Sequence, residues 1–465
     1  MRQTGPTSFE LGFFDQIPSV STYTVILLGF PLPAGTDLQD VKNQLRAATD
    51  TLAKAFPWTR GRVLLHVPEE EKNTSSGTYS VTTERPNEII RFEDVTTSLP
   101  SYEEILRAKV PITMIPPEIL APREGLPSHV DPSKDDVSAL DIQVNLVNGG
   151  LLLCFASNHN VTDMNGQGQL IRLFARALSH DEPFTKQQVE IGNIDRREFL
   201  PRLKNGEKAP GFEHLFGPSK LGQNTWGAAG PPASWKMARF PSEKLKVLKE
   251  LASRKNYSMI VNGTTSAGPE WISTNDALSA FLWQRITAAR ANHLDTKDST
   301  NLVRAINSRK RLQPQIPEEY MGHFVYGTLN SFPIEEIVEE ENIARVAAAL
   351  RQSLYDTDDY TIRAFLDTIS KESDKSKVDY TTTMKWHRDV ILSSWAELGL
   401  STTEFGSLGT PDFVRRPNFA PLPSCIFVVD KTKRGDYDVA ICLTTEDWAE
   451  LEKDKVWEEY VEMIG

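Results

Sequence analysis

Hydrophobic positions in the first half of the chain change repeatedly between the two-residue period of strands and the longer period of helices. Residues 22–32 form an apolar, β-branched run bounded by Gly and Pro, which predicts a strand. Residues 37–56 place apolar side chains at helical spacing. Residues 141–157 predict a hairpin, because their central Asn-Gly-Gly supplies the positive φ angles of a tight turn. Residues 166–180 then predict an amphipathic helix.

The second half repeats this alternation after an interruption. Residues 205–234 are rich in Gly and Pro and lack a period, so we interpret them as a crossover. A helix is expected over 273–292, and the chain is expected to end in a hairpin followed by a helix over 445–464. The pattern predicts a mixed α/β protein with an N-terminal domain over 1–204, the crossover over 205–234 and a C-terminal domain over 235–465.

Charge and composition exclude several classes of protein. The chain has 465 residues and a formal net charge of −12, which argues against nucleic-acid binding, since that requires a dominant basic face. Cys154, Cys425 and Cys442 lie far apart and have no metal-binding spacing, so no metal is expected. We expect neither a secretory leader nor a membrane-spanning window. The composition therefore predicts a cytoplasmic protein that binds neither nucleic acid nor membrane.

The segment SNHNVTD (157–163) places a histidine directly after an apolar run and an aspartate four residues later. Neutral imidazole can accept a proton near neutral pH, so His159 is a candidate general base. The alternative is a satisfied loop or core histidine, because HxxxD also arises by chance. Asp163 is equally suited to cap the helix that follows, and that role is compatible with a place in an active site. The position between strand and helix favours a functional loop.

Five stretches distributed over both halves form one ordered set. They are SNHNVTD (157–163), WISTNDALSAFLW (271–283), NSRKRLQPQIPEEYMG (307–322), LSSWAELG (392–399) and EFGSLGTPDFVRRP (404–417). In this order and at this separation the chain resembles the BAHD acyl-CoA-dependent acyltransferase family of plants and fungi. The resemblance covers nearly the whole chain, and it points to the fungal branch of trichothecene 3-O-acetyltransferases.

This resemblance implies an α/β fold of two similar domains, each a mixed β-sheet flanked by helices, with an active-site channel between them. It implies O-acyl transfer, and specifically O-acetyl transfer, from acyl-CoA to a hydroxyl of a fungal secondary metabolite. Acyl-CoA and a small-molecule alcohol are then the expected partners, and the family relation implies a monomer. Direct transfer agrees with the lack of a recognisable activated Ser or Cys nucleophile in the sequence.

The resemblance also assigns roles to residues of the motif. His159 would remove the proton of the alcohol. Asp163 would point away from the reacting centre and pair with an arginine, with Arg309 as the expected partner and Arg311 as the second choice. This ion pair would fix the loop that positions His159.

Two further groups follow from the same resemblance. The oxyanion formed on the thioester carbonyl needs fixed donors, and the candidates on the oxyanion or acceptor side are Ser393, Ser394 and Trp395, whose alternative role is structural. The expected acyl-CoA contacts are Ser273, Thr274, Lys310 and Arg311. For Ser273 and Thr274 the alternative role is to cap the helix expected over 273–292. For the basic run at 309–311 the alternative is a solvated surface.

The chain departs from the family pattern in three places. The family's DFGWG is here EFGSLG, with Glu404 in place of Asp, which leaves the geometry and ionic partner of this loop open. The family's YFGN is here YMGH, and we interpret His323 as a packing or hydrogen-bonding residue, although a channel position is also possible. Met164 stands where a glycine often follows the motif aspartate.

Two other functions remain open at this point. N-acylation uses the same donor and base, and the sequence does not distinguish an amine from an alcohol acceptor. Peptide-synthetase condensation domains share the two-lobed architecture and an HHxxxDG motif, but Asn158 and Met164 replace two of its residues. A member repurposed for a cyclisation is the third possibility, and the intact His159 and Asp163 do not exclude it.

Overall fold

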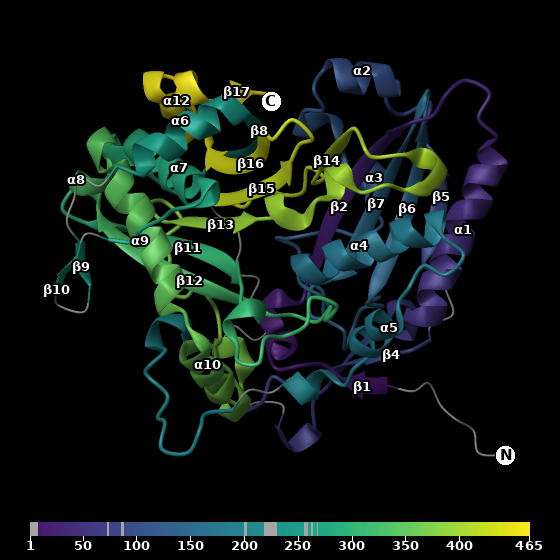
Figure 1. The fold of residues 1–465 in the computed structure, drawn as a ribbon, viewed down its shortest axis with the longest axis horizontal. Coiled ribbons are helices and arrows are strands. Elements are labelled where there is room, and N and C mark those ends of the chain that lie inside the picture. Colours follow the sequence, from purple (N-terminus) through teal and green to yellow (C-terminus); the bar gives the residue numbers. More distant parts are fainter. Residues whose placement is uncertain are drawn as a thin grey trace.

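The computed structural model describes residues 8–71, 74–84, 88–199, 202–217, 230–254, 259–261, 264–266 and 268–465. Two mixed α/β halves lie side by side, one built mainly from the N-terminal part of the chain and one from the C-terminal part (Figure 1). Strands and helices alternate in both, as the hydrophobic pattern predicts.

The first half is organised around a five-stranded mixed sheet with the strand order β14-β2-β7-β6-β5. Every residue of β6 and β7 is buried. β7 is accordingly apolar along most of its length, whereas β6 alternates apolar residues with buried Asp141, Gln143 and Asn145. Helices α1 and α4 pack against one another beside this sheet (Figure 1). The bounds are β2 Tyr23–Pro31, β5 Ile90–Asp94, β6 Leu140–Val147, β7 Gly150–Asn158, β14 Phe413–Arg415, α1 Leu38–Ala55 and α4 Met164–Ser179.

Smaller elements complete this half. A three-stranded sheet has the order β1-β4-β3, and three short helices follow. Their bounds are β1 Ser8–Glu10, β3 Val63–His66, β4 Thr78–Thr82, α2 Tyr102–Arg107, α3 Pro117–Leu120 and α5 Lys186–Gly192.

The second half contains a seven-stranded mixed sheet with the order β12-β11-β13-β15-β16-β8-β17. Helix α7 packs against α6, α9 and α11, so it is buried on nearly all sides. Its buried residues include Gln284, Arg285 and Arg290 as well as apolar side chains. The strands are β8 Ala233–Phe240, β11 Ser299–Asn307, β12 Val325–Pro333, β13 Val390–Ser394, β15 Cys425–Lys431, β16 Tyr437–Thr444 and β17 Glu462–Met463, and a separate hairpin joins β9 Met259–Val261 and β10 Thr264–Ser266. The helices are α6 Ser242–Ala252, α7 Thr274–Arg290, α8 Ile334–Ile337, α9 Ile343–Asp356, α10 Asp359–Lys371, α11 Thr445–Leu451 and α12 Lys455–Tyr460.

One strand crosses between the halves. β14 lies late in the chain but pairs antiparallel with β2, with Phe413 opposite Gly29. Gly29 is required there, because a Cβ would lie 2.2 Å from the Phe413 ring. The predicted division at 204 and 235 therefore does not separate the sheets completely.

The EFGSLG segment anchors this crossing strand. Phe405 is fully buried against Phe30, with ring centres 5.0 Å apart, whereas Glu404 is exposed. Gly406 has a φ of 56° and approaches the end of α4 closely, a conformation that favours glycine. The departure from the family motif therefore lies in a packing loop.

The end of the chain differs from its predicted form. The expected helix over 445–464 is interrupted, because Asp454 caps a new helix by accepting hydrogen bonds from the N–H groups of Val456 and Trp457 at 2.9 and 3.2 Å. The final residues form β17, which pairs with β8. Within the described ranges, no helix has the length and apolarity that a membrane crossing requires.

Candidate active site

The HxxxD loop connects the end of β7 to the start of α4. The His159 N–H donates to the carbonyl of Thr22 at 2.8 Å, and the Asp163 side chain accepts from the Gly166 N–H at 2.8 Å as the cap of α4. A Cβ on Gly166 would lie 2.2 Å from the carbonyl oxygen of Met321. The small residue thus lets the 320–324 segment of the second half pack directly on this loop.

Asp163 is a buried carboxylate shared between the two halves. Arg309 donates to its two oxygens at 2.8 and 3.0 Å, and the Phe324 N–H donates to Oδ2 at 2.8 Å. Burial raises the pKa of Asp163, but the charge and hydrogen bonds of Arg309 outweigh it, so the net shift is downward. The predicted ion pair is present, and it is formed with Arg309 rather than Arg311.

A second buried carboxylate, Asp15, lies beside this pair and was not expected from the sequence. Its oxygens accept from the N–H groups of His323 and Gly12 at 2.8 and 2.7 Å, and Arg196 is 3.5 Å away. Burial raises the pKa of Asp15 to about 6 despite Arg196. An aspartate inside the apolar segment FFDQI was the available sequence signal.

His159 lines a cavity between the two halves. Its Nδ1 is buried and has no hydrogen-bond partner in the described part of the chain. Burial lowers the pKa of His159, while the backbone of His159 and Thr162 and the charge of Asp163 act in the opposite direction. The imidazole is consequently neutral near pH 7 and able to accept a proton.

His323 is a second imidazole at the same cavity. Its ring centre lies 4.8 Å from that of His159, and the planes are tilted by 36°. Burial, followed by repulsion from His159, lowers the pKa of His323 to about 3. His323 therefore combines the packing role expected from the sequence, here against Phe14, with the channel position that the sequence had left open.

The Ser393–Trp395 segment separates into two roles. Ser393 and Trp395 line the cavity, and the Trp395 indole N–H donates to Ser393 Oγ at 3.0 Å. The Ser393 hydroxyl hydrogen is then free to donate elsewhere. Ser394 is not among the lining residues, because successive side chains of strand β13 point to opposite faces.

Ser273 and Thr274 lie at the N-terminus of α7. Ser273 is the cap, and it forms a capping box with Asp276. Asp276 also pairs with Arg304 at 2.8 Å and with Arg351. The capping alternative is confirmed for Ser273, and Thr274 is the first residue of the helix.

The basic run does not form one surface patch. Arg309 is only 3 % exposed and is committed to Asp163, while Lys310 points to solvent and pairs with Glu318 at 2.6 Å. Arg311 donates to the carbonyls of Leu354 and Thr357. The alternative of a solvated basic run therefore holds for Lys310 but not for Arg309, because consecutive residues of this 3₁₀ turn point in different directions.

A cavity of about 220 Å³ lies between the halves. The second-half sheet contributes alternate residues of its strands, as expected for one face of a sheet. The first half contributes the start of β2 and His159, so the site is shared. Alternate lining residues of the second-half strands include Val303, Ala305, Val325, Gly327, Ile391 and Ser393.

Comparison with known proteins agrees with this architecture. Residues 22–178 match the trichothecene 3-O-acetyltransferase-like N-terminal domain, and residues 123–457 match the transferase family. The O-acyltransferase pigD of Monascus ruber is 38% identical, covering 97% of each chain. The trichothecene 3-O-acetyltransferase of Fusarium sporotrichioides is 30% identical over 97% of this chain and 95% of its own.

Solved structures extend the comparison to the fold. The crystal structure of the F. sporotrichioides enzyme complexed with coenzyme A and T-2 has a TM-score of 0.86 at 29% identity, covering 99% of this chain and 100% of that one. Vinorine synthase has a TM-score of 0.66 at 16% identity, over 99% and 95% of the two chains, and shares the fold. The two-domain α/β fold expected from the sequence is confirmed, and the chain belongs to the BAHD-type transferase family and is an acyltransferase.

Proposed function

We propose that the protein transfers an acyl group, and specifically acetyl, from acyl-CoA directly to a hydroxyl of a small fungal secondary metabolite, with His159 as general base. The observation that carries this proposal is the orientation of the motif. Asp163 is committed to Arg309 away from the cavity, while His159 lies at the cavity as a neutral imidazole.

The substrates are inferred from relatives that span the whole chain. One is an O-acyltransferase 38% identical to this chain, and another was crystallised with coenzyme A and T-2. An acyl-CoA donor and a hydroxylated acceptor follow by analogy for this protein. The cavity lies between the two halves of one chain, which supports action as a monomer, with domains over 1–204 and 235–465 joined by the 205–234 crossover.

The proposed chemistry has two steps. His159 takes the proton of the acceptor hydroxyl while its oxygen attacks the thioester carbonyl carbon, which places negative charge on the carbonyl oxygen. The carbon–sulfur bond then breaks, CoA leaves as the thiolate, and the imidazolium returns the proton to sulfur. Asp163 does not touch the reacting atoms in this scheme, so its role is positioning.

Ser393 is the proposed donor to the oxyanion. The Trp395 N–H occupies Ser393 Oγ, which polarises the hydroxyl and directs its hydrogen away from the indole. Trp395 is only 5% exposed and is held by Phe427, with ring centres 4.8 Å apart. Trp395 would then position Ser393 rather than bind the oxyanion itself, and Ser394 would have no part in this step.

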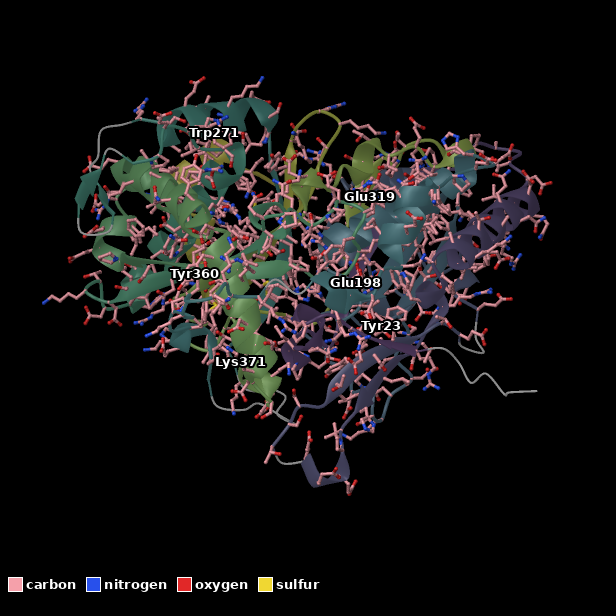
Figure 2. All side chains as sticks on the ribbon, turned by 60° about the horizontal axis from the view of Figure 1, so that its bottom comes forward. Tyr23, Glu198, Trp271, Glu319, Tyr360 and Lys371 are labelled. Atoms are coloured by element: carbon pink, nitrogen blue, oxygen red, sulfur yellow. The ribbon has the colours of Figure 1, made fainter. Side chains whose placement is uncertain are left out.

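The donor side is proposed to lie at the start of α7. Three arginines, Arg304, Arg311 and Arg351, interact electrostatically there, and in the described part of the chain Asp276 is the carboxylate paired with Arg304 and Arg351. Trp271 lies on the surface of the second half, 54% exposed, with the Arg351 guanidinium 4.3 Å from its ring centre (Figure 2). Excess positive charge beside Ser273 and Thr274 suits the phosphates of CoA. Lys310 is a weaker candidate because it is exposed and already pairs with Glu318.

The test replaces His159 with Ala. Positioned base catalysis contributes about 10²–10⁴-fold in rate, so thiol release from acetyl-CoA with a panel of alcohols should fall by that factor, while CoA affinity measured by calorimetry should not change. His180→Ala is the matched control, since His180 is an exposed histidine at the other end of α4. Turnover by His159→Ala close to that of the control would refute the base assignment.

The oxyanion assignment has its own test. Ser393→Ala should lower kcat by about 10²–10³-fold, as loss of one oxyanion donor typically does, and Trp395→Phe should lower it less because the hydroxyl remains. If Trp395→Phe were the more damaging change, the indole and not Ser393 would be the donor.

A further inference from the structure

Arg416 is a buried guanidinium at the wall of the cavity. It is 3% exposed and lines the same cavity as His159. Its terminal nitrogens donate to the backbone carbonyls of Leu126 and Pro417. Among the residues that the structure describes, no carboxylate forms an ion pair with it.

Aromatic rings take the place of a counterion. The Arg416 guanidinium lies 4.6 Å from the ring centre of Trp235, 5.0 Å from that of Phe419 and 5.2 Å from that of Phe427. These ring faces stabilise a cation without neutralising it. Burial lowers the pKa of Arg416 to about 10, so the group remains charged at neutral pH.

The neighbouring residue shows how the same side chain is neutralised elsewhere. Arg415 is 1% exposed and donates to Asp438 at 2.7 Å. Adjacent residues of one segment thus carry two buried guanidinium groups. Arg415 is paired with a carboxylate inside the protein, whereas Arg416 lines the cavity and, among the described residues, forms no ion pair. A buried charge is costly unless it is paired, so a complementary charge is expected from outside the protein.

We propose that Arg416 binds an anionic oxygen of the acceptor, and that the acceptor is a flat hydroxylated molecule bearing a carboxylate or an acidic enol or phenol. This inference rests on the proposed acyl transfer at His159, since it names the class of molecule that receives the acyl group. The planar guanidinium suits a carboxylate or a conjugated oxygen. Phe419 and Phe427 line the same wall and suit a flat ring.

A carboxylate also lies at this cavity. Asp379 lines it and accepts hydrogen bonds from the N–H and hydroxyl of Thr381. Arg416 is a cationic side chain among the lining residues, so an anionic oxygen of the acceptor would be attracted to its end of the cavity.

The experiment measures binding to the full-length protein without acyl-CoA, so that turnover plays no part. The probes are 6-hydroxy-2-naphthoate and 2-naphthol, which share a ring system and differ by the carboxylate. The wild-type protein should bind the naphthoate about 10-fold more tightly, the size expected for a charge-assisted hydrogen bond. This preference should disappear in Arg416→Gln and shrink in Arg416→Lys, and Arg107→Gln, which removes an exposed arginine, should keep it.

The outcomes separate the possibilities. Equal affinity of the wild type for both probes overturns the proposal, and this comparison holds even where Arg416→Gln does not fold. A preference that persists in folded Arg416→Gln also overturns it. Saturating CoA should leave the affinity for the naphthoate unchanged. If CoA and the naphthoate excluded one another, Arg416 would belong to the donor site, and the proposal would be overturned. If the kinetics of His159→Ala refuted His159 as the base, the measured preference for the naphthoate would be unaffected. The two proposals can therefore be refuted independently.

Discussion

Each half of the protein buries an aspartate at the start of a long helix, but the two aspartates have different surroundings. Asp163 caps α4 and Asp276 lies in the first turn of α7, and both are 0% exposed. Both pair with arginines from one stretch of the second half, Arg304 in β11 and Arg309 just beyond it. Strand β11 and the 3₁₀ turn that follows it therefore supply a counterion to each helix.

The difference is in the balance of charge. Asp163 and its neighbour Asp15 are matched by Arg309 and Arg196. Asp276 alone is matched by two arginines, and a third arginine lies near enough to affect them. A balanced cluster can hold a loop without attracting ions, whereas an excess of positive charge at a helix N-terminus attracts an anion. We therefore propose that a buried aspartate with its arginines positions the catalytic loop in one half and forms part of the donor site in the other.

Asp163→Asn should produce the largest effect. The amide retains the helix cap but leaves Arg309 buried without a counterion, which costs about 3–5 kcal/mol. The free energy of unfolding, measured in denaturant, should fall by this amount, and kcat should fall as the His159 loop loses its position. The matched control is Asp358→Asn at the exposed cap of α10, where the stability should scarcely change. A fully stable yet inactive Asp163→Asn would make Asp163 a direct participant.

Asp276→Asn sharpens the comparison at the other helix. It leaves Arg304 and Arg351 without their carboxylate, so we expect a loss of about 3 kcal/mol in the free energy of unfolding. Because this carboxylate does not hold the catalytic loop, the kcat of the folded protein should be retained while the KM for acyl-CoA changes. A selective fall in kcat would show that the two aspartates serve the same purpose.

Arg351→Gln tests the excess charge with a smaller expected effect. Affinity for CoA should weaken about tenfold, as expected for one charge-assisted phosphate contact, and its dependence on ionic strength should become weaker. Arg345→Gln is the matched control, since Arg345 lies on the same helix and pairs with Glu336. Equal effects of the two changes would place the phosphates elsewhere.

The pH dependence of kcat/KM is expected to show the smallest effect of these tests. Of the two aspartates, only Asp163 lies near the proposed base, His159. Burial holds the pKa of His159 below the ordinary value of 6.5. Because the neutral imidazole is the active form, kcat/KM should be constant near neutrality and fall as the pH decreases through the His159 pKa, below 6.5. A half-maximal rate above that pH would mean that another group controls the reaction.

Local features of the molecule follow from the sequence alone. Strand and helix periods predict β2, α1, the β6–β7 hairpin and α4, since each depends on side chains within a few positions of one another. The caps at Asp37, Asp163 and Ser273 are equally local. Asp454 carries the same kind of signal, and the interruption of the last helix could have been predicted from it.

Only the tertiary structure decides which distant groups share the site. Asp163 meets Arg309 across 146 positions, and Asp15 meets His323 across 308. No periodicity relates residues so far apart, and the choice between Arg309 and Arg311 depends on which way a 3₁₀ turn faces when the halves pack. The same packing turns Arg415 toward Asp438 and Arg416 toward the cavity. Sequence patterns specify elements through short-range geometry, whereas the partners of buried charges are selected by which surfaces are brought together to exclude water.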